Sequence, residues 1–192
     1  MIKAFRMKYI FIYLLVFICS LISSLCYGQN KINLIYNITD INKPSNDTFN
    51  IKKVSIVNHS DSIIIILKNR NKITFPPGKI WGYQDSHNTI YRYFDGDFYY
   101  VRQLDTMIIY SRVGGKSNKY YFSEGGNGKI LSLGTKSLKK EFANNACLLN
   151  KIANEYKWYQ DYSAYNKKTK SYRIVEFFKY CLDNIQVARK KS

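Results

Sequence analysis

The sequence predicts an α+β fold, in which an antiparallel β-meander sheet is followed by two C-terminal amphipathic helices. Two patterns support this prediction. From residue 51 to residue 134, short runs of β-branched and aromatic residues alternate with turn-forming Gly, Asn, Asp and Pro, which is typical of antiparallel strands. From residue 135 onward, apolar residues recur instead at the spacing of an amphipathic helix. We therefore expect a single domain over residues 51–192, β-rich over 51–134 and helical over 135–192.

The first 28 residues have the three parts of a secretory signal peptide. Basic residues at positions 3, 6 and 8 precede an apolar run over residues 9–25, and Cys26-Tyr27-Gly28 puts small residues at the −3 and −1 positions of a cleavage site. We expect cleavage between Gly28 and Gln29, and export to the periplasm, the cell surface or the medium. After cleavage, no transmembrane segment is expected in the mature chain.

Residues 29–50 are polar, rich in Asn and interrupted by Pro44, so we expect an extended N-terminal lead with one strand at residues 32–38. The first hairpin follows this lead. Two β-branched runs, NIKKVSIV and DSIIIILKN, flank the turn-forming residues Asn58-His59-Ser60-Asp61. Pro76-Pro77-Gly78 then ends this part of the chain and begins the next strands of the meander.

An aromatic stretch at residues 78–103, GKIWGYQDSHNTIYRYFDGDFYYVRQ, supplies these next strands. Alternation places Trp81 and Tyr83 on one face and Ile80 on the other, and neither face of the following strands is cleanly polar. We therefore expect both faces of the sheet to be covered, with the rings packing in the core and across strands. The alternative is an exposed aromatic face that stacks on sugar rings or on a partner. Its ligand-facing residues would be Trp81, Tyr83, Tyr91 and Tyr93.

Two amphipathic helices are expected in the last third of the sequence. Ser137 is the expected N-cap of the first helix, and a polar break at residues 160–170 separates the first helix from the second. The apolar stripe of the first helix is Leu138, Phe142, Leu149, Ile152 and Tyr156, and that of the second is Ile174, Phe178, Cys181, Leu182 and Ile185.

Cys147 and Cys181 are the cysteines that remain after signal cleavage, an even pair for an oxidising compartment. We hypothesise a disulfide between them. Cys181 lies within its apolar stripe, whereas Cys147 lies opposite its own, and the two sulfurs can meet if the second helix packs against the back of the first. Two unpaired cysteines are the alternative, and the sequence leaves this choice open.

Three segments, PGKIWGYQDSHNTIYRYFDGDFYYV, KYYFSEGG and LGTKSLKKEF, lie within residues 76–142. They resemble an uncharacterised family of exported, signal-peptide-bearing proteins of Bacteroidota, in which a G-x-x-W/F-G-Y-x-D…Y-R-x-F segment precedes a Y-Y-F-S strand and a T-K-x-x-L-K helix start. A glutamine directly after signal cleavage, as at Gln29, is also similar to this family. The family has no assigned activity, so the resemblance implies export and identifies no site residue.

The sequence has no metal-binding or catalytic signature, and no cofactor is expected. His59 and His87 both lie in turn-like segments, without the ligand spacing of a zinc site. Asp95 and Asp97 flank Gly96 as in a tight hairpin turn. The run GGNGK at residues 125–129 lacks the first glycine and the final Ser or Thr of a phosphate-binding loop. These observations favour a non-enzymatic protein and leave the question of an enzyme open.

The chain carries 30 Lys+Arg against 13 Asp+Glu, a formal net charge of +17. The excess is uneven, because residues 131–192 hold 13 basic and 5 acidic side chains. Such a chain is attracted to anionic surfaces, and nucleic acid is not an expected partner of an exported protein. A genome rich in AT codons would raise the lysine content without selection for a partner, and this alternative also stays open.

We therefore predict an exported envelope protein that acts as a non-enzymatic binding or structural module, with affinity for an anionic envelope polymer or for lipid headgroups. Its anion-binding residues would be Lys167, Lys168 and Lys170, which lie in the polar break between the helices. The alternative is a hydrolase that acts on an envelope polysaccharide or on peptidoglycan. The carboxylates considered for such an activity are Asp85, Asp95, Asp97 and Glu124.

Overall fold

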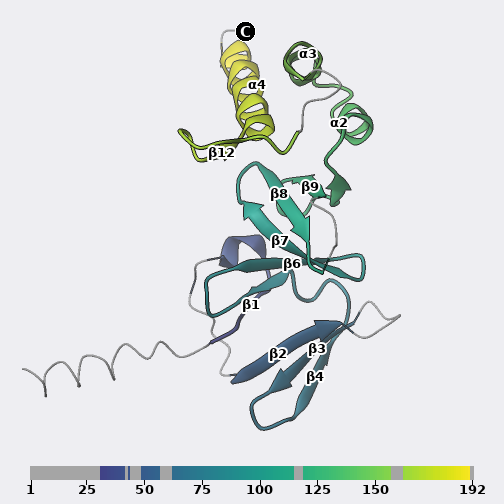
Figure 1. The fold of residues 1–192 in the computed structure, drawn as a ribbon, viewed down its shortest axis with the longest axis vertical. Coiled ribbons are helices and arrows are strands. Elements are labelled where there is room, and N and C mark those ends of the chain that lie inside the picture. The colour runs from purple at the N-terminus through teal and green to yellow at the C-terminus, as the bar shows by residue number, and fades with distance from the viewer. Residues whose placement is uncertain are drawn as a thin grey trace, which may run out of the picture. The chain divides into compact units, whose positions relative to one another are not determined.

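The computed structural model describes residues 31–41, 43, 49–56, 62–114, 119–156 and 162–190, with side chains described up to residue 185 (Figure 1). The expected signal peptide at residues 1–28, its neighbour Gln29, Pro44 and the turn at residues 58–61 with His59 lie outside these residues. The fold is α+β, as the sequence predicts, because the two larger antiparallel sheets precede the helices along the chain.

Within the described residues, the larger sheet has seven strands in the order β1-β5-β6-β7-β8-β9-β10, and each neighbouring pair is antiparallel. These strands are β1 (Asn33–Ile35), β5 (Gly82–Gln84), β6 (Ile90–Phe94), β7 (Asp97–Gln103), β8 (Met107–Arg112), β9 (Tyr120–Glu124) and β10 (Leu131–Ser132). From β5 to β10, neighbours in the sheet are also consecutive in the chain, so the predicted meander is present. The strand expected at residues 32–38 is shorter, since the chain enters the 3-10 helix η1 (Ile38–Asp40) soon after Ile35.

The predicted first hairpin belongs to a separate sheet, which the sequence did not distinguish from the meander. Its strands in the described part of the chain are β2 (Ile51–Ile56), β3 (Ile63–Leu67) and β4 (Lys72–Phe75). Ile63 and Ile65 of β3 are buried, and they join Leu34, Ile80 and Tyr93 in one apolar cluster. The smaller sheet therefore covers part of one face of the larger sheet.

Both faces of the larger sheet are packed. The strand register puts Tyr93, Phe98, Ile109 and Phe122 on one face, which the smaller sheet covers at Tyr93 and the helical segment covers at Ile109 and Phe122. On the opposite face, Tyr110 packs with buried residues that include Tyr99, Ile108 and Ile130. Two apolar faces in the sequence thus correspond to two packed faces in the fold.

The helical segment differs from the prediction in its number of helices. In the described residues it contains α2 (Thr135–Glu141), α3 (Ala146–Glu155) and α4 (Arg173–Lys190), so the first expected helix is two helices. The break occurs because α2 ends at Glu141, with Phe142 as its C-cap, and the side chain of Asn145 accepts a hydrogen bond from the amide of Leu148, which starts α3. The expected N-cap, Ser137, lies inside α2, whose N-cap is Gly134.

The break shifts the apolar stripe of α3 by one residue. Leu148 is fully buried, whereas the predicted stripe residue Leu149 is only half-buried. Leu138 and Phe142 of α2 and Ile152 of α3 pack in the same cluster as Leu148. The two short helices therefore both direct their apolar sides to one core.

The expected polar break between the helices is partly ordered as a small hairpin. Its strands are β11 (Tyr165–Asn166) and β12 (Ser171–Tyr172), and the four residues between them form the turn. The helix α4 begins directly after β12 and buries Ile174, Val175 and Phe178 against the sheet and the other helices. In the described part of the chain, no helix is long and apolar enough to span a membrane.

Candidate functional site

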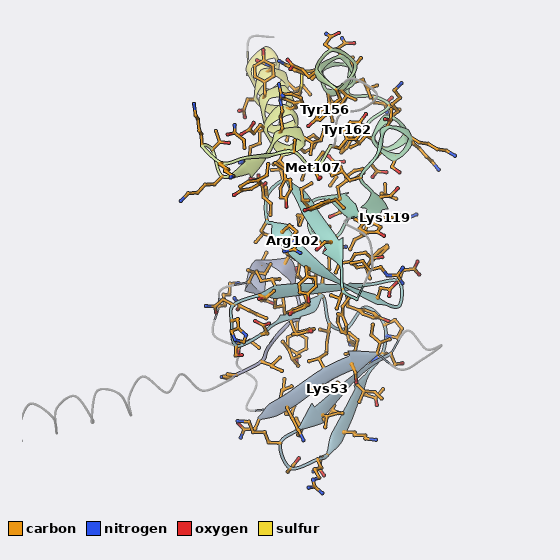
Figure 2. All side chains as sticks on the ribbon, viewed as in Figure 1. Lys53, Arg102, Met107, Lys119, Tyr156 and Tyr162 are labelled. Atoms are coloured by element: carbon orange, nitrogen blue, oxygen red, sulfur yellow. A yellow bond between two sulfur atoms is a disulfide. The ribbon has the colours of Figure 1, made fainter. Side chains whose placement is uncertain are left out.

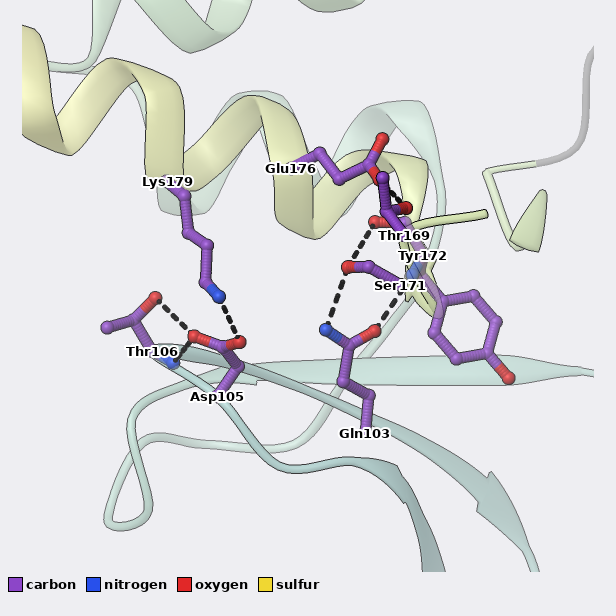
Figure 3. A network of polar contacts seen from close by, with 8 residues as sticks. All are labelled: Gln103, Asp105, Thr106, Thr169, Ser171, Tyr172, Glu176 and Lys179. Carbon is purple, nitrogen blue, oxygen red and sulfur yellow. Dashed lines mark hydrogen bonds and ion pairs between the residues drawn. The ribbon is translucent and has the colours of Figure 1, made fainter. Parts of the chain in front are cut away.

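The hairpin β11–β12 and α4 are bonded to the β7–β8 end of the larger sheet (Figure 3). The side-chain amide of Gln103 donates to Ser171 Oγ at 2.9 Å, and Gln103 Oε1 accepts from the Tyr172 amide at 2.8 Å. Next to it, Lys179 Nζ lies 2.6 Å from Asp105 Oδ2. These contacts place the hairpin and the first turns of α4 at a fixed position against the sheet.

Asp105 is the carboxylate of this contact, and its surroundings favour the charged form. Burial acts to raise the pKa of Asp105, but hydrogen bonds from Lys179 and from the Thr106 amide, together with the charge of Lys179, outweigh burial and lower the pKa below its ordinary value. The Thr106 amide donates to Asp105 Oδ1 at 2.7 Å. The Lys179–Asp105 pair is therefore an ionised contact at neutral pH.

Helices α3 and α4 are joined by two further contacts. A disulfide links Cys147 of α3 to Cys181 of α4, with Cα atoms 5.7 Å apart. Lys151, one turn after Cys147 on the same face of α3, lies against Phe177 and Tyr180 of α4, so the second helix packs on the face of α3 that carries Cys147, as the hypothesised disulfide requires. Near the start of α4, Arg173 Nη2 lies 2.8 Å from Glu155 Oε2 of α3.

A hollow of about 520 Å³ lies between the β11–β12 hairpin and the first turns of α4. It is lined by Ala164, Tyr165, Asn166, Arg173, Glu176 and Phe177. Tyr165 is 50% exposed, so part of its ring is open to solvent at the hollow. The hollow combines aromatic walls with an arginine and a carboxylate, a composition found in sites that bind small polar molecules.

The two charged residues of the hollow, Glu176 and Arg173, differ in how many of their hydrogen-bonding groups already have partners. Glu176 accepts hydrogen bonds from Thr169 and, at 3.3 Å, from Asn166, so hairpin groups already bind its carboxylate. The Arg173 guanidinium lies 5.5 Å from the centre of the Phe177 ring and uses Nη2 for Glu155. Its side chain is still 45% exposed. An arginine has five N–H donors, so Arg173 keeps donors for a ligand.

The predicted anion-binding lysines lie at the turn of this hairpin, beside the hollow. Lys167, Lys168 and Lys170 are all exposed, and together we call them the basic turn. Asn166 Oδ1 accepts from the Lys168 amide at 3.1 Å, which fixes the backbone of the turn. Among the described residues, no carboxylate forms an ion pair with any of the three lysines.

The predicted ligand-facing aromatic residues do not form an open platform. Trp81 and Tyr93 are each only 8% exposed. Tyr83 and Tyr91 stack on each other, with ring centres 4.4 Å apart and planes 6° apart. Burial and the nearby charge of Asp85 raise the pKa of Tyr83 to about 12.

The stack continues beyond Tyr91. The ring of Tyr100 lies 4.8 Å from the Tyr91 ring, and the guanidinium of Arg102 lies 5.3 Å from the Tyr100 ring (Figure 2 labels Arg102). Ring faces that cover one another offer only edges and hydroxyl groups to a ligand. These tyrosines therefore serve cross-strand packing, which was the first of the two interpretations of the sequence.

The expectation that Trp81 and Tyr83 share a face is wrong. Tyr83 and Ile80 pack in the cluster between the two sheets, whereas Trp81 packs with Ile35 and Ile41. The alternation fails at Gly82, because a Cβ atom there would overlap the carbonyl oxygen of Tyr91. Only glycine permits this close approach of β5 to β6, and strict alternation cannot be read across it.

The glycine-rich loop at residues 125–128 directs carbonyl groups inward. The indole N–H of Trp81 donates to Gly126 O, and Arg92 Nη2 donates to Gly128 O, both at 2.7 Å. Arg92 is 4% exposed and also donates to Tyr110 Oη at 2.7 Å. A loop whose carbonyl oxygens bind a buried arginine is a structural contact and has the opposite polarity to a phosphate site.

Two of the carboxylates considered for a hydrolase, Asp85 and Asp97, have structural partners. Asp85 Oδ1 accepts from the amides of His87 and Thr89, as in a turn. Asp97 Oδ2 lies 2.7 Å from Arg112 Nη2, and Asp95 has a positive φ in the turn with Gly96. Within the described residues, no three His, Cys, Asp or Glu side chains are grouped so as to hold a metal ion.

The sequence predicted the lysines of the basic turn as anion-binding residues and gave no signal for Tyr165 and Phe177, which line the hollow. A single tyrosine in a polar segment gave no signal, because its importance depends on pairing with Tyr172 across a hairpin that the sequence did not predict. In comparisons with known proteins, no family model matches the chain, and no curated protein or solved structure matches it either.

Proposed function

We propose that the protein is an exported, non-enzymatic binding or structural module that associates with an anionic component of the cell envelope through the basic turn. The single observation that supports this proposal most is the grouping of Lys167, Lys168 and Lys170 on one exposed turn, with no ion-pairing carboxylate among the described residues. Without the three basic residues of the expected signal peptide, 27 Lys+Arg remain against 13 Asp+Glu, and this net charge of +14 would attract the whole molecule to the same kind of surface.

The attachment of the basic turn also supports this proposal. The turn belongs to a hairpin that Gln103 bonds to the sheet, and α4 follows directly and is linked to α3 by the disulfide. Because the backbone of the turn is already held in place, binding need not order it, and more of the attraction to an anionic partner remains as affinity. Such an attraction is screened by salt, which gives a clear experimental signature.

Co-sedimentation with purified outer membrane tests the proposal. Replacing Lys167, Lys168 and Lys170 with Gln should lower the partition coefficient at low salt at least tenfold, since each lysine near an anionic surface contributes roughly 1 kcal/mol. High salt should lower binding of the unmodified protein to a similar extent. The matched control replaces Lys52, Lys53 and Lys72, three exposed lysines of the smaller sheet, with Gln.

The control variant has the same net charge as the basic-turn variant, so it separates position from total charge. We expect it to keep most of the binding. Equal losses for the two variants would show that net charge alone drives association and would contradict a specific role for the basic turn. Binding that is insensitive to salt and to both sets of substitutions would contradict an electrostatic association altogether.

A further inference from the structure

The hollow beside the basic turn has the dimensions and lining of a ligand site. Its volume of about 520 Å³ lies within the range of roughly 300–1,000 Å³ that is usual for small-molecule sites, enough for one or two sugar rings. Tyr165 and Phe177 provide apolar walls, and Arg173 provides an exposed cation. The basic turn belongs to the same hairpin as Tyr165, since β11 leads directly from Tyr165 and Asn166 into Lys167.

From these features we infer that the hollow binds one acidic sugar residue of an anionic polysaccharide, with Arg173 bonded to the sugar carboxylate and Tyr165 packed against the sugar ring. This inference rests on the proposed function and names its ligand class. The planar guanidinium of Arg173 matches a carboxylate through two parallel N–H donors, which a lysine does not do. The C–H surface of a sugar ring carries a slight positive charge and suits the negative face of an aromatic ring.

The local contacts orient the groups that would bind the sugar. Phe177 packs under the Arg173 guanidinium at 5.5 Å, and Glu155 holds one end of it at 2.8 Å. Tyr165 is held edge-to-face by Tyr172, with ring centres 5.2 Å apart, and Tyr172 is itself bonded to Gln103. Both groups are therefore positioned before a ligand arrives.

Glu155 competes with the ligand, because its carboxylate occupies a donor that a sugar carboxylate would also use. Changing Glu155→Gln removes the competing charge and should tighten the binding of an acidic sugar severalfold. The matched control is Asp97→Asn, which removes the carboxylate of a similar exposed pair with Arg112 and should leave the affinity within twofold. A residue with only a structural role would not produce tighter binding when it is removed.

Isothermal titration calorimetry of the purified protein with a linear galacturonate hexamer tests the inference directly. Arg173→Lys keeps the charge but loses the planar donor pair, and it should raise Kd about tenfold. Tyr165→Ala should raise Kd severalfold, whereas Tyr165→Phe should bind like the unmodified protein. Arg112→Lys and Tyr180→Ala change an exposed arginine and an exposed tyrosine outside the hollow, and both should leave Kd unchanged. Thermal melting of each variant verifies that it is folded.

Further arms distinguish the sources of negative charge. The methyl-esterified hexamer, which has no free carboxylates, should bind at least tenfold more weakly than the acid. If inorganic tripolyphosphate competes fully and with the same dependence on Arg173, the hollow is a phosphate site and the inference is wrong. If Arg173→Lys and Tyr165→Ala leave Kd unchanged while the basic-turn variant loses membrane binding, the hollow is not the site and the proposed function stands. No binding of the hexamer to the unmodified protein would also overturn the inference.

Discussion

Gly82 shows how one residue sets the arrangement of a whole strand. Its Cα lies so close to β6 that a side chain would overlap the backbone of Tyr91. On either side of it, Trp81 and Tyr83 join different apolar clusters. The position therefore allows a tryptophan to reach Gly126 on one face while a tyrosine stacks on Tyr91 on the other.

Replacing Gly82 with Ala should be strongly destabilising. The new Cβ must displace the β6 backbone, and we expect the free energy of unfolding to fall by about 3 kcal/mol or more, at the upper end of overpacking costs. Urea denaturation followed by circular dichroism measures this change. Gly78→Ala is the control, because Gly78 has a positive φ of 77° but free space around it, so only the backbone strain of roughly 1–2 kcal/mol applies. If Gly82→Ala lowers the free energy of unfolding no more than Gly78→Ala does, a Cβ atom at residue 82 does not clash with β6.

Single residues also show what the sequence cannot provide. The turn residues around Asp85 and Gly96 were recognisable, because their chemistry acts over a few neighbouring positions. Arg92 was not recognisable as a buried residue. Its partners Tyr110, Ser123 and Gly128 lie 18, 31 and 36 residues away along the chain. No local sequence pattern predicts that all three bond to the same guanidinium.

At the scale of elements, the helices were predicted by their periodicity but not by their number. The spacing of Leu138, Phe142 and Ile152 is helical throughout, so it conceals the turn at Asn145. Asn145 can cap a helix or lie within one, and tertiary packing decides between these roles. The same limit applies to the polar break, where two-residue strands such as β11 are too short for a periodic signal.

The contact between α4 and the β7–β8 turn should depend on pH. The pKa of Asp105 in the folded protein is lowered from its ordinary value of 3.8. The ionised carboxylate therefore stabilises the folded protein fully above pH 3.8, and this stabilisation is lost as the pH falls through the folded-state pKa. Asp105→Asn should reduce the free energy of unfolding at pH 7 by about 0.5–1 kcal/mol, since Lys179 is half-exposed and water screens the pair. The difference in the free energy of unfolding between Asp105→Asn and the unmodified protein should become smaller below about pH 4.

Chemical denaturation at pH 7 and at pH 3 measures this difference. Asp183→Asn is the control, since it removes an exposed carboxylate from the same helix, and it should change stability at pH 7 by less than about 0.5 kcal/mol. If Asp105→Asn lowers the free energy of unfolding equally at both pH values, ionisation of Asp105 does not contribute to the contact.

At the scale of the whole molecule, the order of β-rich and helical segments was predictable, because each type of element has its own period. The division of the strands into two sheets was not predictable, since β4 and β5 are separated by only a few residues that include Pro76-Pro77-Gly78. Whether the chain continues one sheet or starts another depends on the packing of the apolar cluster that contains Ile65 and Tyr93, which lie far apart in the sequence.

The disulfide should contribute substantially to the stability of the helical segment. Cys147 and Cys181 are 34 residues apart, and closing such a loop is worth roughly 3–4 kcal/mol in the chain-entropy model. Reduction should lower the free energy of unfolding by about this amount, as measured by denaturation with and without a phosphine reductant. A variant with both cysteines replaced by Ala should not respond to the reductant.

Peptide mapping of alkylated, unreduced protein provides the independent control on the same bond. It should recover Cys147 and Cys181 in one cross-linked species. Alkylation of both residues in the unreduced protein would contradict the pairing, and an unchanged denaturation midpoint after reduction would contradict its stabilising effect.

The strand order of the larger sheet has a consequence for the speed of folding. From β5 to β10 every strand pairs with its neighbour in the chain, so these hairpins close short loops and should form early. The β1–β5 pair is different, because Ile35 meets Gly82 across the entire smaller sheet. Closing that long loop has the largest entropic cost in the sheet, so the docking of β1 should be the late event that completes it.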